Sequence, residues 1–129
     1  MSNSEKLIPV LVCQDIAAEH DFLVETLGFS SGGIRRTPEG QAVHGEVRIG
    51  DFVIWLHRVV DEFKLASPRS MPAASSGLFV YVADVDAHYA RARARGARTE
   101  SDLKDMPYGR QYELTDPEGH RWWFASPPK

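Results

Sequence analysis

The hydrophobic and polar positions of this chain follow the same order twice. In each half, a short apolar run is followed by an aspartate, by an amphipathic run ending at a glycine, and by two alternating runs. Alternation with a period of two is typical of strands, and apolar spacing of three or four is typical of helices. Asp15 and Asp84 close the opening runs, and Glu46 and Glu113 occupy matching later places. The pattern predicts two copies of one strand–helix–hairpin unit, with a binding groove between them.

The first copy is predicted to begin with a strand over residues 7–14, which is rich in valine, leucine and isoleucine. Asp15 stands where a helix cap is expected, because its carboxylate can accept from free N–H groups one turn later. A helix is predicted over 16–27 from its apolar spacing, and Gly28 suits a left-handed helix end. An extended segment is expected at 29–31 and a loop at 35–40. A hairpin follows, with strands at 41–49 and 52–59.

The second copy repeats this plan after a linker. Residues 61–77 contain two prolines and several small polar residues, so we expect them to separate the copies. The second copy is then expected to have a strand at 78–83, a helix at 85–95 and hairpin strands at 109–115 and 120–126. A length of 129 residues is that of one domain, here residues 1–129. We divide it into a first module (5–60), the linker and a second module (78–126).

Alternation also assigns each hairpin residue to one of two sheet faces, because successive strand residues point to opposite sides. The apolar face, expected to meet the helix, holds Val43, Val47, Ile49, Phe52, Ile54 and Leu56, and in the second copy Tyr112, Leu114, Trp122 and Phe124. The opposite face holds His44, Glu46, Arg48, Val53, Trp55 and His57, and then Gln111, Glu113, Arg121 and Trp123. A fully solvated face rarely carries two tryptophans, so we expect a partly enclosed groove. The alternative is an offset of one residue, which would place Trp55 and Trp123 in the core.

Composition and charge exclude several classes of protein. The net charge of −3 argues against a dedicated nucleic-acid binder, which needs clustered positive charge. The single cysteine, Cys13, cannot form an intramolecular disulfide, so the fold does not depend on an oxidising compartment. No apolar stretch is long enough for a signal peptide or a membrane span. We therefore expect a cytoplasmic protein that binds neither nucleic acid nor membrane.

The order of these segments resembles the vicinal oxygen chelate superfamily, which includes glyoxalase I, extradiol dioxygenases and bleomycin-resistance proteins. The resemblance lies in VLVCQDI, FLVETLGF, HGEVRIGDFVIWL, VYVADVDAHYARARARGA and PYGRQYELTDPEGHRWWFA. It implies an α+β fold, with two tandem βαβββ modules that form a concave mixed sheet around a ligand site. It also implies a homodimer, often with modules packed across the interface.

Enzymes of this superfamily hold a divalent metal ion on the first and last strands of each module. By this resemblance, the first-strand positions fall at Ile8 and Gly77 and the last-strand positions at Trp55 and Trp123. Hard and borderline cations need carboxylate oxygen or imidazole nitrogen, and none of these four residues supplies either. The resemblance therefore points to the metal-free, bleomycin-resistance-like branch.

The resulting hypothesis is a metal-independent small-molecule-binding protein without a cofactor or catalytic residues. Its ligand is expected to be aromatic or cationic, such as an antibiotic, because indoles bind such molecules by stacking and cation–π contact. The expected ligand-binding residues are His44, Glu46, Trp55, His57, Phe79, Tyr81, Arg110, Gln111, Glu113 and Trp123. Arg110 is expected to pair with a ligand anion or with Glu113.

Two other classes of function stay open at this point. One is an enzyme, a lyase, isomerase or dioxygenase, with a displaced metal site at His44, Glu46 and His57. A metal-free variant of this enzyme would use Glu46 or Glu113 for acid–base chemistry. The other is a regulatory module whose groove is filled by a partner or by a second copy of the chain.

Overall fold

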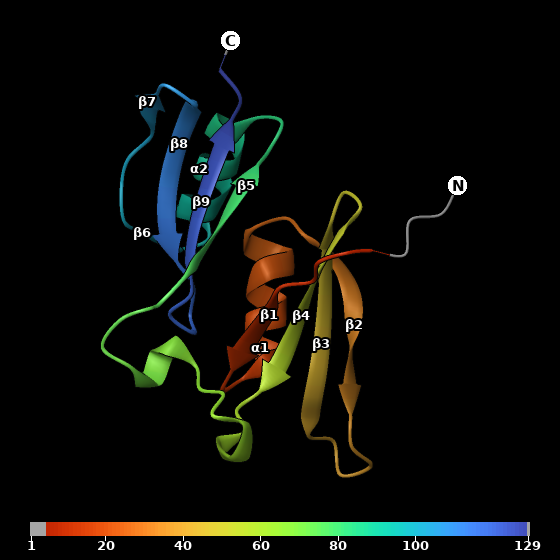
Figure 1. The fold of residues 1–129 in the computed structure, drawn as a ribbon. Helices are drawn as coiled ribbons and strands as arrows, with labels where there is room; N and C mark the ends of the chain where they lie inside the picture. The colour runs from red at the N-terminus through yellow and green to blue at the C-terminus, as the bar shows by residue number, and fades with distance from the viewer. Residues whose placement is uncertain (1–4, 129) are drawn as a thin grey trace.

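The computed structural model describes residues 5–128 and contains two mixed sheets (Figure 1). The first sheet has the order β1-β4-β3-β2, and β1 runs parallel to β4 while the other neighbours are antiparallel. Its strands are β1 (Val10–Cys13), β2 (Ser30–Arg36), β3 (Ala42–Ile49) and β4 (Phe52–Arg58). The helical segment between β1 and β2 covers one face of this sheet, as a βαβββ module requires.

The second sheet repeats this topology in the order β5-β9-β8-β6, with β7 also paired to β8. Its elements are β5 (Gly77–Tyr81), α2 (Val85–Ala94), β6 (Arg98–Thr99), β7 (Lys104–Met106), β8 (Gly109–Thr115) and β9 (Arg121–Ser126). The strand that corresponds to β2 is thus divided into two short pieces. The linker contains two short 3-10 helices, Asp61–Phe63 and Pro68–Ser70. The α+β fold with two βαβββ modules is confirmed.

The helix of each module begins and ends as its sequence predicts. The side chains of Asp15 and Asp84 accept hydrogen bonds from the N–H groups of Ala18 and Ala87, at 3.0 and 3.1 Å. Gly28 and Gly96 both have a φ of 81°, the left-handed conformation that ends a helix. The first helical segment differs from the expected single helix over 16–27. It consists of α1 (Ile16–Asp21) followed by a π-helix, Phe22–Thr26.

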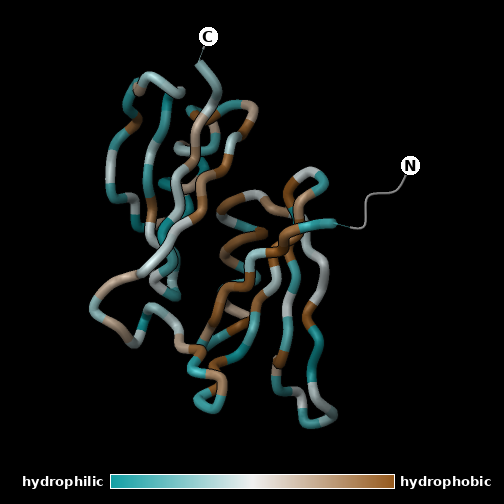
Figure 2. Tube along the Cα trace, viewed as in Figure 1, coloured by the Kyte–Doolittle hydropathy of each residue, from teal (hydrophilic) through white to brown (hydrophobic). Residues whose placement is uncertain are grey.

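The two modules share one hydrophobic core, formed by the faces of the sheets that meet the helices. Leu23 and Leu27 of the first module and Tyr112, Trp122 and Phe124 of the second belong to the same buried cluster. Figure 2 shows that hydrophobic residues gather along α1, whereas the tip of the β2–β3 hairpin is hydrophilic. In the described part of the chain, no helix has the length and hydropathy needed to cross a membrane.

The position of this core differs from the expectation of a groove between the two modules of one chain. Phe29 packs against Trp122, with ring centroids 5.6 Å apart, and His88 of α2 lies 2.9 Å from the Leu27 carbonyl. The modules thus meet through their helix-side faces. The faces that contain Trp55 and Trp123 lie on the other side of each sheet, away from this contact.

Candidate functional site

The outer face of the first sheet holds a carboxylate bonded to an indole. Glu46 of β3 lies directly opposite Trp55 of β4, and the Trp55 Nε1 donates to Glu46 Oε1 at 3.1 Å. Arg48 Nε also donates to Glu46, at 2.9 Å, and this hydrogen bond is the main reason that the pKa of Glu46 lies below its usual value. Trp55 nevertheless keeps 38% of its surface exposed. The predicted assignment of Glu46 and Trp55 to one face is confirmed.

Two histidines extend this face beside the indole. His44 lies directly opposite His57 in the β3–β4 ladder, and the His44 ring meets the Trp55 ring edge-on, with centroids 5.5 Å apart. His57 Nδ1 lies 2.7 Å from the Arg58 carbonyl. Since a carbonyl only accepts, Nδ1 is the protonated nitrogen, and Nε2 is left for other partners. The structure thus brings His44, Glu46, Trp55 and His57 together.

The outer face of the second sheet repeats the pairing of glutamate and tryptophan. Glu113 of β8 lies opposite Trp123 of β9, and Arg121 Nη2 donates to Glu113 Oε2 at 2.6 Å. Phe79 of β5 is the neighbour of Trp123 on the other side. The two modules therefore present matching sets, each with one tryptophan, one glutamate and one arginine.

An aromatic cluster continues this second face toward its edge. Phe79 contacts Tyr81 and Tyr108, with ring centroids 5.1 and 5.9 Å away, and the Tyr81 hydroxyl donates to the Tyr108 carbonyl at 3.1 Å. Gln111, on the same face, is buried, and its Oε1 has no hydrogen-bond partner in the described structure. Tyr108 is a site candidate that the sequence analysis did not select. It precedes β8, so strand alternation gives no signal for its direction.

The residues at the four metal-ligand positions do not fit a metal ion. Ile8, Gly77, Trp55 and Trp123 supply no carboxylate oxygen or imidazole nitrogen. The Trp123 ring lies where a Cβ at Gly77 would stand, so the indole fills the space of a first-strand side chain. Within residues 5–128, no group of three or more His, Cys, Asp or Glu side chains is arranged to hold a metal.

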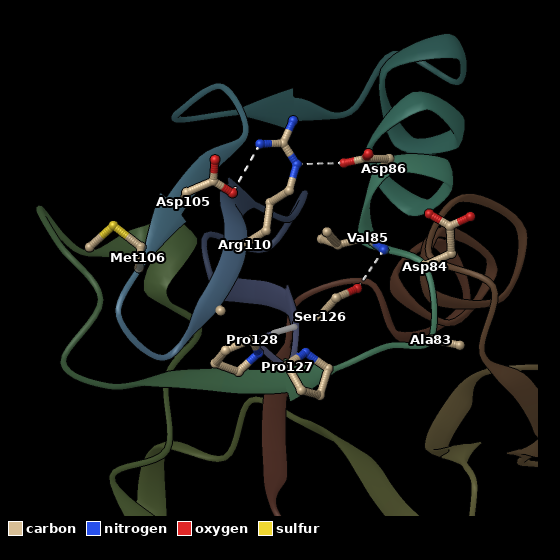
Figure 3. Close-up of a pocket in the computed structure, with 11 residues that line it drawn as sticks. Ala83, Asp84, Val85, Asp86, Asp105, Met106, Arg110, Ser126, Pro127 and Pro128 are labelled. Atoms are coloured by element: carbon tan, nitrogen blue, oxygen red, sulfur yellow. Dashed lines mark hydrogen bonds and ion pairs between the residues drawn. The ribbon is translucent and has the colours of Figure 1, made fainter.

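Arg110 lies elsewhere than expected. Its position in β8 places it on the helix-side face, with Tyr112 and Leu114, and it forms ion pairs with Asp86 of α2 at 2.8 Å and Asp105 of β7 at 3.2 Å. Figure 3 shows these pairs beside Ser126 and the first turn of α2. The expected alternative of a pair with Glu113 is therefore wrong, and Arg110 does not join the Trp123 face. Strand alternation alone places the Arg110 side chain on the opposite sheet face from Gln111 and Glu113.

The other side chains that could take part in chemistry have structural roles. Burial raises the pKa of the Cys13 thiol, which keeps it protonated and inert. His88 lies between the Tyr112 hydroxyl, 2.6 Å from its Nδ1, and the Leu27 carbonyl. His120 Nε2 lies 2.9 Å from the Val12 carbonyl and links the last hairpin to β1.

Comparison with known proteins agrees with this architecture. The model of the Glyoxalase/Bleomycin resistance protein/Dioxygenase superfamily matches residues 8–124. An uncharacterised protein of Mycobacterium bovis is 32% identical over 125 residues, which cover 94% of this chain and 82% of that protein. The crystal structure of TioX from Micromonospora sp. ML1 is similar, with a TM-score of 0.77 and 27% identity over 97% of this chain and 100% of TioX.

A further similar structure is that of TnmS3, an antibiotic binding protein from Streptomyces sp. CB03234. Its TM-score is 0.74 and its identity 27%, over 99% of each chain. The family model covers most of the chain, and the relatives match both modules. The chain therefore belongs to the glyoxalase/bleomycin resistance protein/dioxygenase superfamily.

Proposed function

We propose that this protein binds a planar aromatic small molecule, of the class that includes antibiotics, on the sheet faces that hold Trp55 and Trp123. The observation that supports this best is that tryptophans stand at two positions where enzymes of the superfamily have metal ligands. Trp55 is half-exposed, and the Trp123 ring extends over Gly77 at the start of β5. Aromatic faces of this kind favour flat organic ligands through stacking.

The charges on these faces favour binding over acid–base catalysis. Glu46 accepts from Arg48 and from the Trp55 indole, which stabilise its ionised form and make it a weaker base. Glu113 is likewise held by Arg121. The similarity to TnmS3, an antibiotic binding protein, supports the same class of function. We therefore prefer sequestration of a ligand, without a cofactor, to the enzyme hypothesis.

A homodimer is part of this proposal. An apolar hollow of about 670 Å³ lies where the segment before β1 and the start of β4 approach β5. Leu7 and Phe52, which line it, keep 83% and 74% of their surfaces exposed, and Phe79 keeps 44%. A second copy that covered this region would bury these side chains and enclose the indole faces. The buried thiol of Cys13 is compatible with a reducing compartment, and we propose a cytoplasmic location.

Isothermal titration calorimetry with a panel of planar aromatic antibiotics tests the function. We expect Trp55→Leu and Trp123→Leu to weaken binding by about threefold to tenfold, which is the size of one aromatic contact. Phe63→Leu, which alters an exposed aromatic residue in the linker, serves as the control. Absence of binding across the panel, or equal binding by all three variants, would refute the proposal.

A further inference from the structure

Three basic side chains form one row across the outer face of the first sheet. Arg35 of β2 lies directly opposite His44 of β3, which in turn lies directly opposite His57 of β4. Side chains at directly opposed positions have Cβ atoms about 4.5–5.5 Å apart and share a face. The row is therefore a compact group of a guanidinium and two imidazoles.

This row has no carboxylate of its own. Within residues 5–128, Arg35 forms no ion pair, and the nearby Glu46 is already bonded to Arg48 and Trp55. Opposed groups of like charge destabilise a sheet, so His44 takes up a proton less readily beside Arg35 unless an anion is bound there. Burial and then the charge of Arg35 lower the pKa of His44, and the smaller opposing effect of Glu46 does not outweigh them.

The geometry points to an anion-binding subsite at Arg35, His44 and His57, which would hold the acidic group of an aromatic ligand. This assignment rests on the proposed small-molecule function and specifies the charge of the ligand. The Trp55 ring, 5.5 Å from the His44 ring, offers a stacking surface beside the row. The ligand class is thus a planar aromatic compound with a carboxylate or a similar oxyanion.

The charge of Arg35 favours an anion at this site over a metal ion or a cationic ligand. Two opposed histidines alone could hold a transition metal, but a permanently charged guanidinium beside them repels a cation and offers donors to an oxyanion. The two carboxylates on the outer faces that could attract a cationic ligand, Glu46 and Glu113, are each paired with an arginine. An acidic ligand therefore complements this face better than a basic one.

The test compares 2-naphthoate with its neutral isostere 2-naphthamide by calorimetry. We expect 2-naphthoate to bind about tenfold more tightly, the effect of one charge-assisted hydrogen bond. Arg35→Gln should remove this preference. Arg36→Gln is the matched control, because Arg36 donates to the Gly40 carbonyl in the hairpin tip and should leave the preference intact.

The pH dependence provides a second readout. Arg35, Glu46, Arg48 and His57 are the charged or titratable groups that face His44 from β2, β3 and β4, and β1 contributes only Val12. Because His44 gains a proton only as pH falls through its lowered pKa, the preference for 2-naphthoate should grow from about pH 7 to about pH 5. Inorganic phosphate should shift the NMR ring resonances of His44 and His57, and Arg35→Gln should abolish that shift.

Different results would overturn the two proposals. Equal binding of both naphthalene compounds, unchanged by Arg35→Gln, would overturn the anion subsite and leave the aromatic site standing. Shifts of the two histidines by phosphate that need Arg35, with no binding of aromatic compounds, would support the subsite and overturn the aromatic function. Shifts by zinc but not by phosphate would also overturn the subsite.

Discussion

At the scale of single residues, Glu19 is the side chain most at odds with its surroundings. It lies fully buried in α1, and in its ionised form neither carboxyl oxygen has a hydrogen-bond partner in the described structure. Burial, and then hydrogen bonding to Asp116, raise its pKa well above the usual value. A neutral Glu19 resolves the conflict, because its O–H can donate to the Asp116 carboxylate. A protonated Glu19 would then join α1 to the turn between β8 and β9.

Replacing Glu19 with glutamine tests this protonation state. The folded state holds the Glu19 proton above the unfolded pKa of about 4.5, so the free energy of unfolding falls as pH rises from there through the folded pKa. Glutamine supplies an N–H donor that does not titrate. We expect Glu19→Gln to gain stability over the wild type by about 1–2 kcal/mol near pH 8, and little near pH 4.5. Urea denaturation at both values measures the difference, and parallel pH profiles of the two proteins would contradict it.

A glycine is required at position 77 because of one neighbour, Trp123. A Cβ at this position would overlap the Trp123 ring, which is rigid and cannot yield as a flexible side chain would. We expect Gly77→Ala to destabilise the fold by about 1–3 kcal/mol, the usual effect of overpacking. Trp123→Leu should relieve that penalty, so the double variant should be more stable than the sum of the single effects predicts. Additive changes in urea denaturation would show that the indole does not occupy this space.

At the scale of elements, the turn between β8 and β9 connects both modules with the linker. Glu118 accepts from the N–H groups of Gln14 and Asp15, at 2.7 and 2.9 Å, and from the Ser67 hydroxyl at 2.7 Å. These partners lie far away in the sequence, at the end of β1 and in the linker. The turn therefore fixes the orientation of the first helix relative to the second sheet.

Glu118→Ala should show the strength of this connection. It leaves two backbone N–H groups without their acceptor, whereas the Ser67 hydroxyl keeps the main-chain carbonyl of residue 118, 3.0 Å away. We expect a loss of about 2–4 kcal/mol. Glu39→Ala, at the exposed tip of the β2–β3 hairpin, is the control and should change stability by less than about 0.5 kcal/mol. Thermal unfolding compares them, and similar melting temperatures would argue against the role of the turn.

The elements that follow from local sequence patterns were predictable, and those that depend on distant contacts were not. The strand expected at 109–115 is found at Gly109–Thr115, and the helix expected at 85–95 at Val85–Ala94. The π-helix Phe22–Thr26 was missed because apolar spacing does not reveal a shift to i→i+5 hydrogen bonds. Only the start of β2, within 29–31, was expected to be extended, and Arg35 was assigned to a loop, so its sheet face was not predicted. Likewise, no pattern links Glu118 to Gln14, which lies 104 residues earlier.

At the scale of the whole molecule, strand alternation predicted which sheet face holds each tryptophan. It did not predict how the two tryptophan-bearing faces are placed relative to each other. Alternation predicts that Glu46 faces Trp55 and Glu113 faces Trp123, and both pairs are present. The way two repeated modules pack depends on which apolar surfaces meet, and Phe29 against Trp122 decides this here. Because the modules meet through the helix-side faces, a single chain leaves its indole faces on the outside.

This arrangement makes the oligomeric state decisive for the site. Phe52, at the β3–β4 turn, and Leu7 are large apolar side chains left mostly exposed beside the hollow at β5. We expect the wild type to sediment as a dimer, and Phe52→Asp to shift it toward the monomer by placing a charge in the interface. Phe63→Asp, an equally drastic change in the linker, should leave the dimer intact. Monomeric wild type at micromolar concentration in analytical ultracentrifugation would contradict this, and ligand binding by that monomer would mean that one chain suffices to form the site.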